Sequence, residues 1–188
     1  NLEDMPEGAN IGTGSFRRKA QLLHFRPDLN VVDMRGNINT RLQKAQSPDF
    51  DGIILAAAGL TRMGWLDRIQ QFLSCEIMIP AVGQGALSIQ VREDDRAARK
   101  LIAPLNDLKT ETAVNAERLF LHKMGGGCQT PMGAFCQVRG DQVVLQGFCA
   151  EEDGSAFIKK QFEGPVEQAL DLAARLAERL LEKSPGNS

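Results

Sequence analysis

The chain has 188 residues, 43% hydrophobic and 24% charged, with a formal net charge of −2 at pH 7. These values are typical of a soluble globular protein with a sizeable core, and they argue against a nucleic-acid partner. No apolar run approaches the roughly 20 residues that a membrane span needs, so no membrane partner is expected. The acidic start lacks the features of a signal peptide, and the absence of an initiator methionine suggests processing or a start within a longer protein.

The cysteines form no CxxC pair and no metal-like spacing with the two histidines, so we expect neither a metal site nor a disulfide framework. A chain of this size with few cysteines is typical of a reducing compartment, which predicts a cytoplasmic location. Two of the four, Cys136 and Cys149, fall on predicted strands and are interpreted as small core residues.

The first part of the chain alternates strand and helix signals. After a short apolar stretch, strands are predicted over residues 30–34, 52–57 and 76–79, and helices over 15–25, 37–45, 58–63 and 67–72. This alternation indicates an α/β domain with a mostly parallel sheet.

The glycine-rich segment 80–85 interrupts the alternation and is typical of a crossing or hinge. Beyond it we predict a strand over 86–91, helices over 93–103 and 110–124, strands over 132–139, 142–149 and 156–162, and a last helix over 165–183 with an apolar stripe. The Gly140-Asp141 pair marks a hairpin turn between the first two of the later strands. A three-stranded antiparallel sheet with helices, a small α+β domain, is therefore expected.

Arginines and hydroxyl side chains gather at the turn from the first strand into the first helix. Thr13, Ser15, Arg17 and Arg18 occur there, where unpaired backbone N–H groups and a positive helix end favour an anion. An arginine can also clamp a carboxylate through two hydrogen bonds. The alternative, a helix N-cap at Ser15 followed by two solvated arginines, is equally open on local sequence.

A second strand end carries similar residues, Arg35, Asn37 and Arg41, and Arg62 follows the third strand. Ligands of open α/β sheets bind at the carboxyl ends of strands. Two such ends that both carry arginines therefore favour a ligand site. Phosphate, sulfate or a polycarboxylate would suit such a cationic site equally well.

Cys128 follows three glycines and precedes Gln129-Thr130-Pro131, which predicts an accessible loop. A loop thiol becomes a nucleophile where nearby cations lower its pKa. On local sequence alone, an incidental free cysteine is the favoured interpretation.

Together these pieces resemble the porphobilinogen deaminase family. The resemblance is carried, in the family's order, by Gly12–Arg18, Arg35–Arg41, Ile53–Gly64, Pro80–Gly85 and Gly126–Gly133. It implies a transferase of tetrapyrrole (porphyrin and heme) biosynthesis that joins four porphobilinogen molecules into hydroxymethylbilane and releases ammonia. It also implies a dipyrromethane cofactor held through a thioether to Cys128, with porphobilinogen and the growing polypyrrole as partners, in a monomer.

The resemblance further implies a division of the chain. Residues 1–85 would form a periplasmic-binding-protein-like α/β domain, 86–105 a crossover that completes an absent N-terminal domain, and 106–188 the α+β domain with the cofactor cysteine. The positions that match cofactor-binding residues of the family are Thr13, Ser15, Arg17, Arg18, Arg35, Asn37, Arg41, Gln84, Gly85 and Cys128. The positions that match binding of the substrate chain are Arg17, Arg35, Arg41 and Arg62.

Two departures from the family stand out. Gly14 occupies a position where family members commonly have a hydroxyl residue. The family's catalytic aspartate belongs to the N-terminal domain and has no counterpart here, so no catalytic residue is assigned and the chain alone is expected to be inactive. Without that domain, residues 86–103 are expected to be disordered or repacked. The alternatives are a non-catalytic anion-binding module and a redox or interaction protein that uses Cys128.

Overall fold

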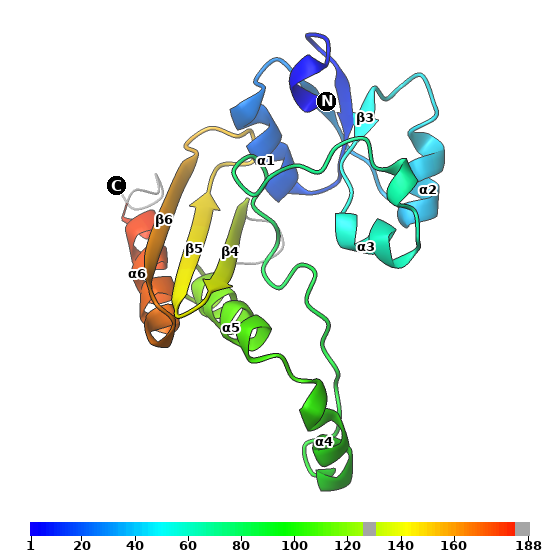
Figure 1. Ribbon diagram of the computed structural model, residues 1–188. Coiled ribbons are helices and arrows are strands. Elements are labelled where there is room, and N and C mark those ends of the chain that lie inside the picture. Colours follow the sequence, from blue (N-terminus) through cyan, green and yellow to red (C-terminus); the bar gives the residue numbers. More distant parts are fainter. Residues whose placement is uncertain (126–130, 183–188) are drawn as a thin grey trace.

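The computed structural model describes residues 1–125 and 131–182, which form two small sheets with their helices and one projecting segment between them (Figure 1). The first sheet contains β1 (Asn10–Gly12), β2 (Asn30–Val32) and β3 (Gly52–Ile53), all parallel, in the order β2-β1-β3. Its helices are α1 (Phe16–Phe25), α2 (Ile38–Lys44) and α3 (Ala57–Arg62), with short 3-10 turns at Leu2–Asp4 and Leu66–Arg68. The predicted α/β domain with a parallel sheet is confirmed.

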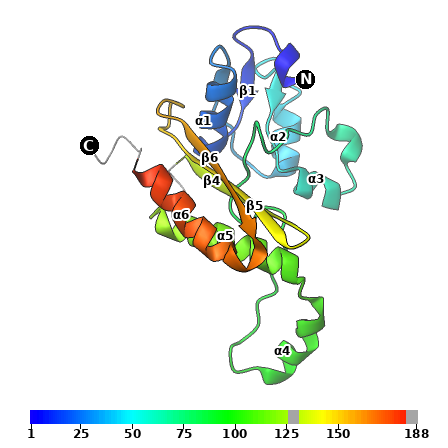
Figure 2. The same ribbon diagram turned by 60° about the vertical axis from the view of Figure 1, so that its left-hand side comes forward.

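The second sheet is antiparallel, in the order β4-β5-β6. Its strands are β4 (Met132–Arg139), β5 (Gln142–Cys149) and β6 (Ile158–Pro165), and α5 (Leu108–Lys123) and α6 (Ala169–Leu181) lie side by side on one face (Figure 2). A 3-10 turn, Val166–Gln168, leads into α6. The predicted three-stranded α+β domain is confirmed, including the hairpin turn, where Gly140 takes a φ of 64°.

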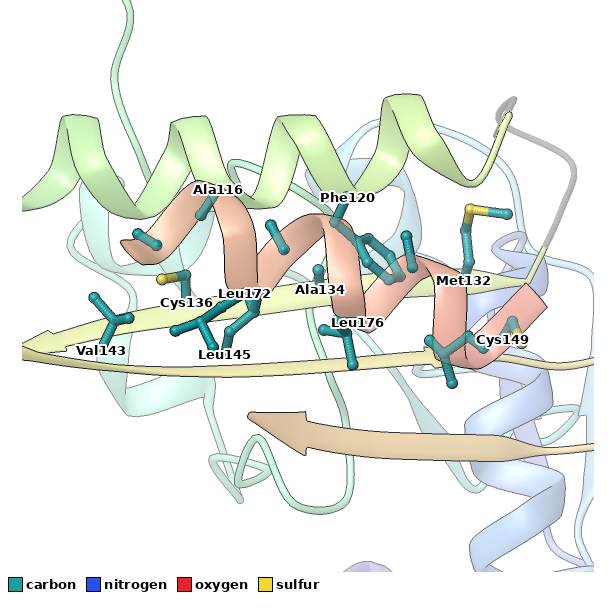
Figure 3. Packing of buried hydrophobic residues seen from close by; sticks show 14 residues of the cluster. Ala116, Phe120, Met132, Ala134, Cys136, Val143, Leu145, Cys149, Leu172 and Leu176 are labelled. Carbon is teal, nitrogen blue, oxygen red and sulfur yellow. The ribbon is translucent and has the colours of Figure 1, made fainter. Parts of the chain in front are cut away.

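The main core lies between α5, α6 and the second sheet (Figure 3). Leu172 and Leu176 of α6 and Phe120 of α5 are buried there, and Cys136 and Cys149 are buried small residues as interpreted. Gly147 leaves the space that these helices need, since a Cβ at this position would lie 2.9 Å from a methyl group of Leu176. The apolar stripe predicted for the last helix is confirmed at Ala173, Leu176 and Leu180, which are buried. It was wrong at Leu170, which is 51% exposed, and it omitted the buried Leu172.

The opposite face of the second sheet packs against the first domain. The ring of His24 on α1 stacks on Phe157 at a centroid distance of 3.9 Å, and Phe157 stacks in turn on Phe148 at 5.1 Å. The Lys159 ammonium of β6 donates to the carbonyl of Glu76 at 2.7 Å. Helix α1 is thus shared, because it covers its own sheet and also contacts the antiparallel one.

Three predicted elements are wrong. Residues 76–79 form no strand. The Gln21 side chain binds both the N–H and the carbonyl of Ile79, which in a strand would pair with a neighbouring strand. Residues 86–91 likewise form no strand, since they project from both sheets. The helix predicted over 67–72 is reduced to the single 3-10 turn at Leu66–Arg68.

The projecting segment contains helix α4 (Arg96–Ile102) and a 3-10 turn (Ala103–Leu105), and it extends away from both sheets in both views (Figures 1 and 2). Its apolar side chains are unusually exposed: Leu87 is 77% and Leu101 80% accessible. Among the residues that the structure describes, no helix has the length and apolar character needed to cross a bilayer.

Candidate anion-binding and cofactor site

The turn from β1 into α1 is built by short-range hydrogen bonds. The buried Thr13 hydroxyl oxygen accepts from the Ser15 N–H at 3.3 Å, and the Ser15 hydroxyl oxygen accepts from the Arg18 N–H at 3.4 Å. Ser15 is therefore the N-cap of α1, which is the local role that the sequence had left open. The cap directs Arg17 and Arg18, in the first turn of the helix, toward the interior.

Gly14 is required by the packing of this turn. A Cβ at Gly14 would lie 2.8 Å from the carbonyl oxygen of Met34 and 3.0 Å from a carboxylate oxygen of Asp33. A hydroxyl residue at this position would need the backbone after β2 to shift. The close approach of the Met34 carbonyl therefore favours glycine at this position.

Arg17 and Arg18 are partly buried and each is anchored by one backbone carbonyl. An Arg17 Nη1 N–H donates to Ile79 at 2.5 Å, and an Arg18 Nη1 N–H donates to Ile54 at 2.9 Å. A guanidinium has five N–H donors, so each of these contacts orients the group and uses only part of its capacity.

Burial and mutual repulsion act together on these cations. Burial lowers the pKa of Arg17 to about 10, and the neighbouring charge of Arg18 acts in the same direction. Burial also lowers the pKa of Arg18, and the charge of Arg41 on α2 lowers it further. The ion pairs among the described residues include none of these three arginines. A bound polycarboxylate would relieve this repulsion, so the cluster suits an anionic ligand with several carboxylates.

Helix α2 supplies the second group of predicted residues. Asn37 is its N-cap and accepts from the Thr40 N–H at 2.9 Å, while the Arg41 Nε–H donates to the carbonyl of Gly36 at 2.8 Å. Arg35 differs from the others because its side chain is 88% exposed and pairs with Asp33 at 3.1 Å. The structure thus brings Arg41 close to Arg18 and leaves Arg35 in solvent.

Arg62, at the end of α3, lies against the predicted hinge. Its Nη2 donates to the carbonyl of Gly85 at 3.4 Å, and both this arginine and Gln84 are exposed. Gly85 takes a φ of 90°, which favours glycine at this turn. These three residues form an outer edge of the site, separate from the inner arginines on α1.

Cys128 lies outside the described residues, but both of its flanks are described. Gly125 follows α5. Just before β4, the carbonyl oxygen of Pro131 accepts a hydrogen bond from the N–H of Ala150 at 2.9 Å. Further along β4, a Cβ at Gly133 would lie 3.2 Å from Cδ of Arg17 and 2.7 Å from the carbonyl oxygen of Pro80. The strand that follows the cysteine segment therefore begins beside the inner arginines.

Two buried polar residues of this region were not predicted. Gln21 and Glu117 are only 1% and 5% exposed, and both bind backbone groups of the segment between the domains. A sequence signal existed for Glu117, since it interrupts an apolar stripe formed by Ala113, Ala116 and Phe120. A lone charge on a buried helix face needs partners, and here both are backbone N–H groups.

Comparison with known proteins gives two family matches along the chain. Residues 1–100 match the family described as "Porphobilinogen deaminase, dipyromethane cofactor binding domain", and residues 111–182 match "Porphobilinogen deaminase, C-terminal domain". The chain is 49% identical over 183 residues to the porphobilinogen deaminase of Syntrophotalea carbinolica, covering 97% of this chain and 58% of that protein.

Two further curated relatives agree. The porphobilinogen deaminase of Syntrophus aciditrophicus is 46% identical over 96% of this chain and 59% of its own length. The protein of the same name from Geobacter metallireducens is 47% identical over 95% of this chain and 56% of its own length. The chain thus spans a little under three fifths of these relatives. The two matched domains account for most of its length, and the chain belongs to the porphobilinogen deaminase family.

Proposed function

We propose that this chain forms the cofactor-binding and C-terminal domains of a hydroxymethylbilane synthase, a cytoplasmic and monomeric enzyme of tetrapyrrole biosynthesis. The enzyme joins four porphobilinogen molecules head to tail and releases ammonia. The observation that carries the proposal is the cluster of Arg17, Arg18 and Arg41, unpaired with any described carboxylate and next to the start of β4.

The inner arginines bind carboxylates in this proposal. Porphobilinogen carries an acetate and a propionate, so a chain of pyrroles presents many anionic groups. Arg18 and Arg41 receive them at the N-terminal end of α1, where the backbone adds its own positive potential. Arg35 and Arg62 extend the cationic surface outward along α2 and α3. Thr13, Ser15 and Asn37 shape the turns that present these groups.

Cys128 is the proposed attachment point of the dipyrromethane, with Gln84 and Gly85 at the neighbouring hinge. When bound through a thioether, the cofactor supplies the terminal pyrrole to which the first substrate is added. In the division proposed for the chain, residues 1–85 bind the cofactor and substrate, 86–105 cross toward an N-terminal domain, and 106–188 carry the cysteine. The family's catalytic aspartate belongs to that N-terminal domain.

Replacement of the cysteine tests this function directly. In the full-length protein, Cys128→Ser should abolish hydroxymethylbilane formation and remove an adduct with the mass of two linked pyrroles, because a hydroxyl cannot replace the thiolate as attacking group. Cys75→Ser, a change at a half-buried thiol that no part of the proposal uses, is the matched control and should retain both. Retained activity in Cys128→Ser would refute the assignment.

The 188-residue chain should itself form no hydroxymethylbilane from porphobilinogen, because it lacks the general acid–base carboxylate of the family. The assay is the absorbance of the cyclised and oxidised product after prolonged incubation. Addition of a separately produced N-terminal domain should restore measurable activity. Turnover by the chain alone would show that its own residues carry out the proton transfers.

A further inference from the structure

The segment between the two domains, residues 79–83, is held from both sides by buried side chains. On the side of the first domain, Gln21 Nε2 donates to the carbonyl of Ile79 at 3.0 Å, and its Oε1 accepts from the Ile79 N–H at 2.7 Å. On the side of the second domain, Glu117 Oε2 accepts from the Gly83 N–H at 2.7 Å. We call residues 79–83 the linker.

Glu117 also binds the second sheet. Its other carboxylate oxygen, Oε1, accepts from the Cys136 N–H of β4 at 2.8 Å. Among the described residues it is the only buried side chain of the Asp, Glu, Lys or Arg type, and none of the ion pairs found there includes it. One carboxylate on α5 therefore connects the linker to the strand that follows the Cys128 segment.

These contacts form a closed series of which Arg17 is a member. Arg17 donates to Ile79 at one end of the linker, Gly83 at the other end donates to Glu117, and Glu117 accepts from β4. Gly133 of this strand lies beside Arg17, since a Cβ built at Gly133 would be 3.2 Å from Cδ of Arg17. The relative position of the arginine cluster and β4 thus depends on these contacts.

We propose that Glu117 is a positioning residue, which fixes the arginine cluster of the first domain relative to β4, the strand that follows Cys128, by pinning Gly83 to Cys136. The inference deepens the proposed function and rests on it for the role of Cys128. A carboxylate suits this task because it accepts two N–H donors at once and offers no donor of its own.

The variant Glu117→Gln separates this role from a general contribution to packing. The amide has nearly the same volume, but its NH₂ group faces one of the two N–H donors, so either Gly83 or Cys136 loses its acceptor. The core between α5, α6 and the sheet is unchanged. Glu111→Gln, on the exposed side of the same helix, removes the same charge and is the matched control.

The first measurement is the distance between the domains in the full-length holoenzyme. Spin labels attached through keto amino acids at Lys44 and Asp141, both exposed, report it by double electron–electron resonance without using a thiol. The wild type and Glu111→Gln should give one narrow distribution, and Glu117→Gln a broadened or shifted one. Glu117→Asp, which keeps the charge but is one methylene shorter, should show the same change and serves if the amide variant does not fold.

The second measurement is turnover. Misplacement on the ångström scale should lower kcat of Glu117→Gln by about tenfold to a hundredfold, with the dipyrromethane adduct still present by intact mass. A distance distribution like that of the wild type overturns the proposal, as does a changed distribution with unchanged kcat. The distance between the domains can be measured whether or not the enzyme assignment is correct. A wrong assignment would be seen in a different experiment, as retained activity in Cys128→Ser.

Discussion

Arg17 and Arg35 occupy similar places in the sequence pattern but have different surroundings. Arg17 is anchored to the Ile79 carbonyl and lies beside Gly133 of β4, whereas Arg35 is almost fully exposed beside Asp33. In the proposed function the first arginine therefore contributes to both the fold and ligand binding, whereas the second contributes to ligand binding alone.

Substitution should separate these two roles. Arg35→Ala should change the free energy of unfolding by no more than about 0.5 kcal/mol, as at other exposed positions, while it weakens binding of a pyrrole polycarboxylate. Arg17→Ala should lower the free energy of unfolding by about 1–3 kcal/mol, because it removes a charged hydrogen bond to a buried carbonyl. Urea unfolding and titration calorimetry measure the two effects. Equal stability loss in both variants would contradict the distinction.

At this scale the sequence predicted which residues are cationic and where they lie, because strand ends and helix starts are local features. The Ser15 cap was one of the alternatives that local sequence offered, but the inward turn of Arg18 to the Ile54 carbonyl could not be predicted, since that contact joins residues far apart in the chain. Gln21 and Glu117 were missed for the same reason. Gln21 binds the backbone of Ile79, which has no regular structure, and Glu117 joins Gly83 to Cys136 of β4 across a long sequence separation.

Helix α5 packs on the antiparallel sheet and precedes the segment that carries Cys128, and its N-cap is Asp107. The Asp107 carboxylate accepts from the Thr110 N–H at 2.7 Å. This backbone hydrogen bond and a side-chain hydrogen bond to Thr110 hold the pKa of Asp107 below its ordinary value of 3.8. The folded state therefore favours the ionised form.

The pH dependence of stability follows from this shift. Because the folded pKa is lowered, the contribution of the Asp107 charge is present above about 3.8 and is lost as the pH falls through the lower, folded pKa. Asn caps nearly as well as Asp but does not titrate. The stability advantage of the wild type over Asp107→Asn, measured by urea unfolding, should therefore be present at neutral pH and vanish in acid. An advantage that grows with acidity would contradict this cause.

Helices and strands with a clear period were predicted well, as α1, α5, α6 and the three antiparallel strands show. The errors lie where backbone groups find partners other than a neighbouring strand. Ile79 pairs with the Gln21 side chain, and residues 86–91 lie away from both sheets. Apolar composition alone does not distinguish such segments from strands.

The whole molecule exposes an apolar surface on its projecting segment. Leu101, Leu105 and Leu108 are 80%, 70% and 73% accessible, values more typical of an interface than of a free surface. In the proposed full-length protein this segment crosses toward the N-terminal domain. In the 188-residue chain its leucines face water.

The chain alone should therefore self-associate as its concentration rises. Sedimentation velocity should show an increasing weight-average mass, and Leu101→Glu with Leu105→Glu should return the protein to a monomer with little change in thermal stability, because these side chains contribute little to either core. A monomeric wild type at the highest concentrations would show that this surface has no affinity for itself.

The projecting segment begins and ends next to the same helix, α5. Gly83 is fastened to Glu117, and the chain returns at Leu108 on the same α5, roughly 14 Å away along the axis at 1.5 Å per residue. A handful of extended residues would bridge that gap. Since closing a longer loop costs only about 0.6 kcal/mol per doubling of its length, the length of this excursion by itself has little effect on the stability of the two sheets.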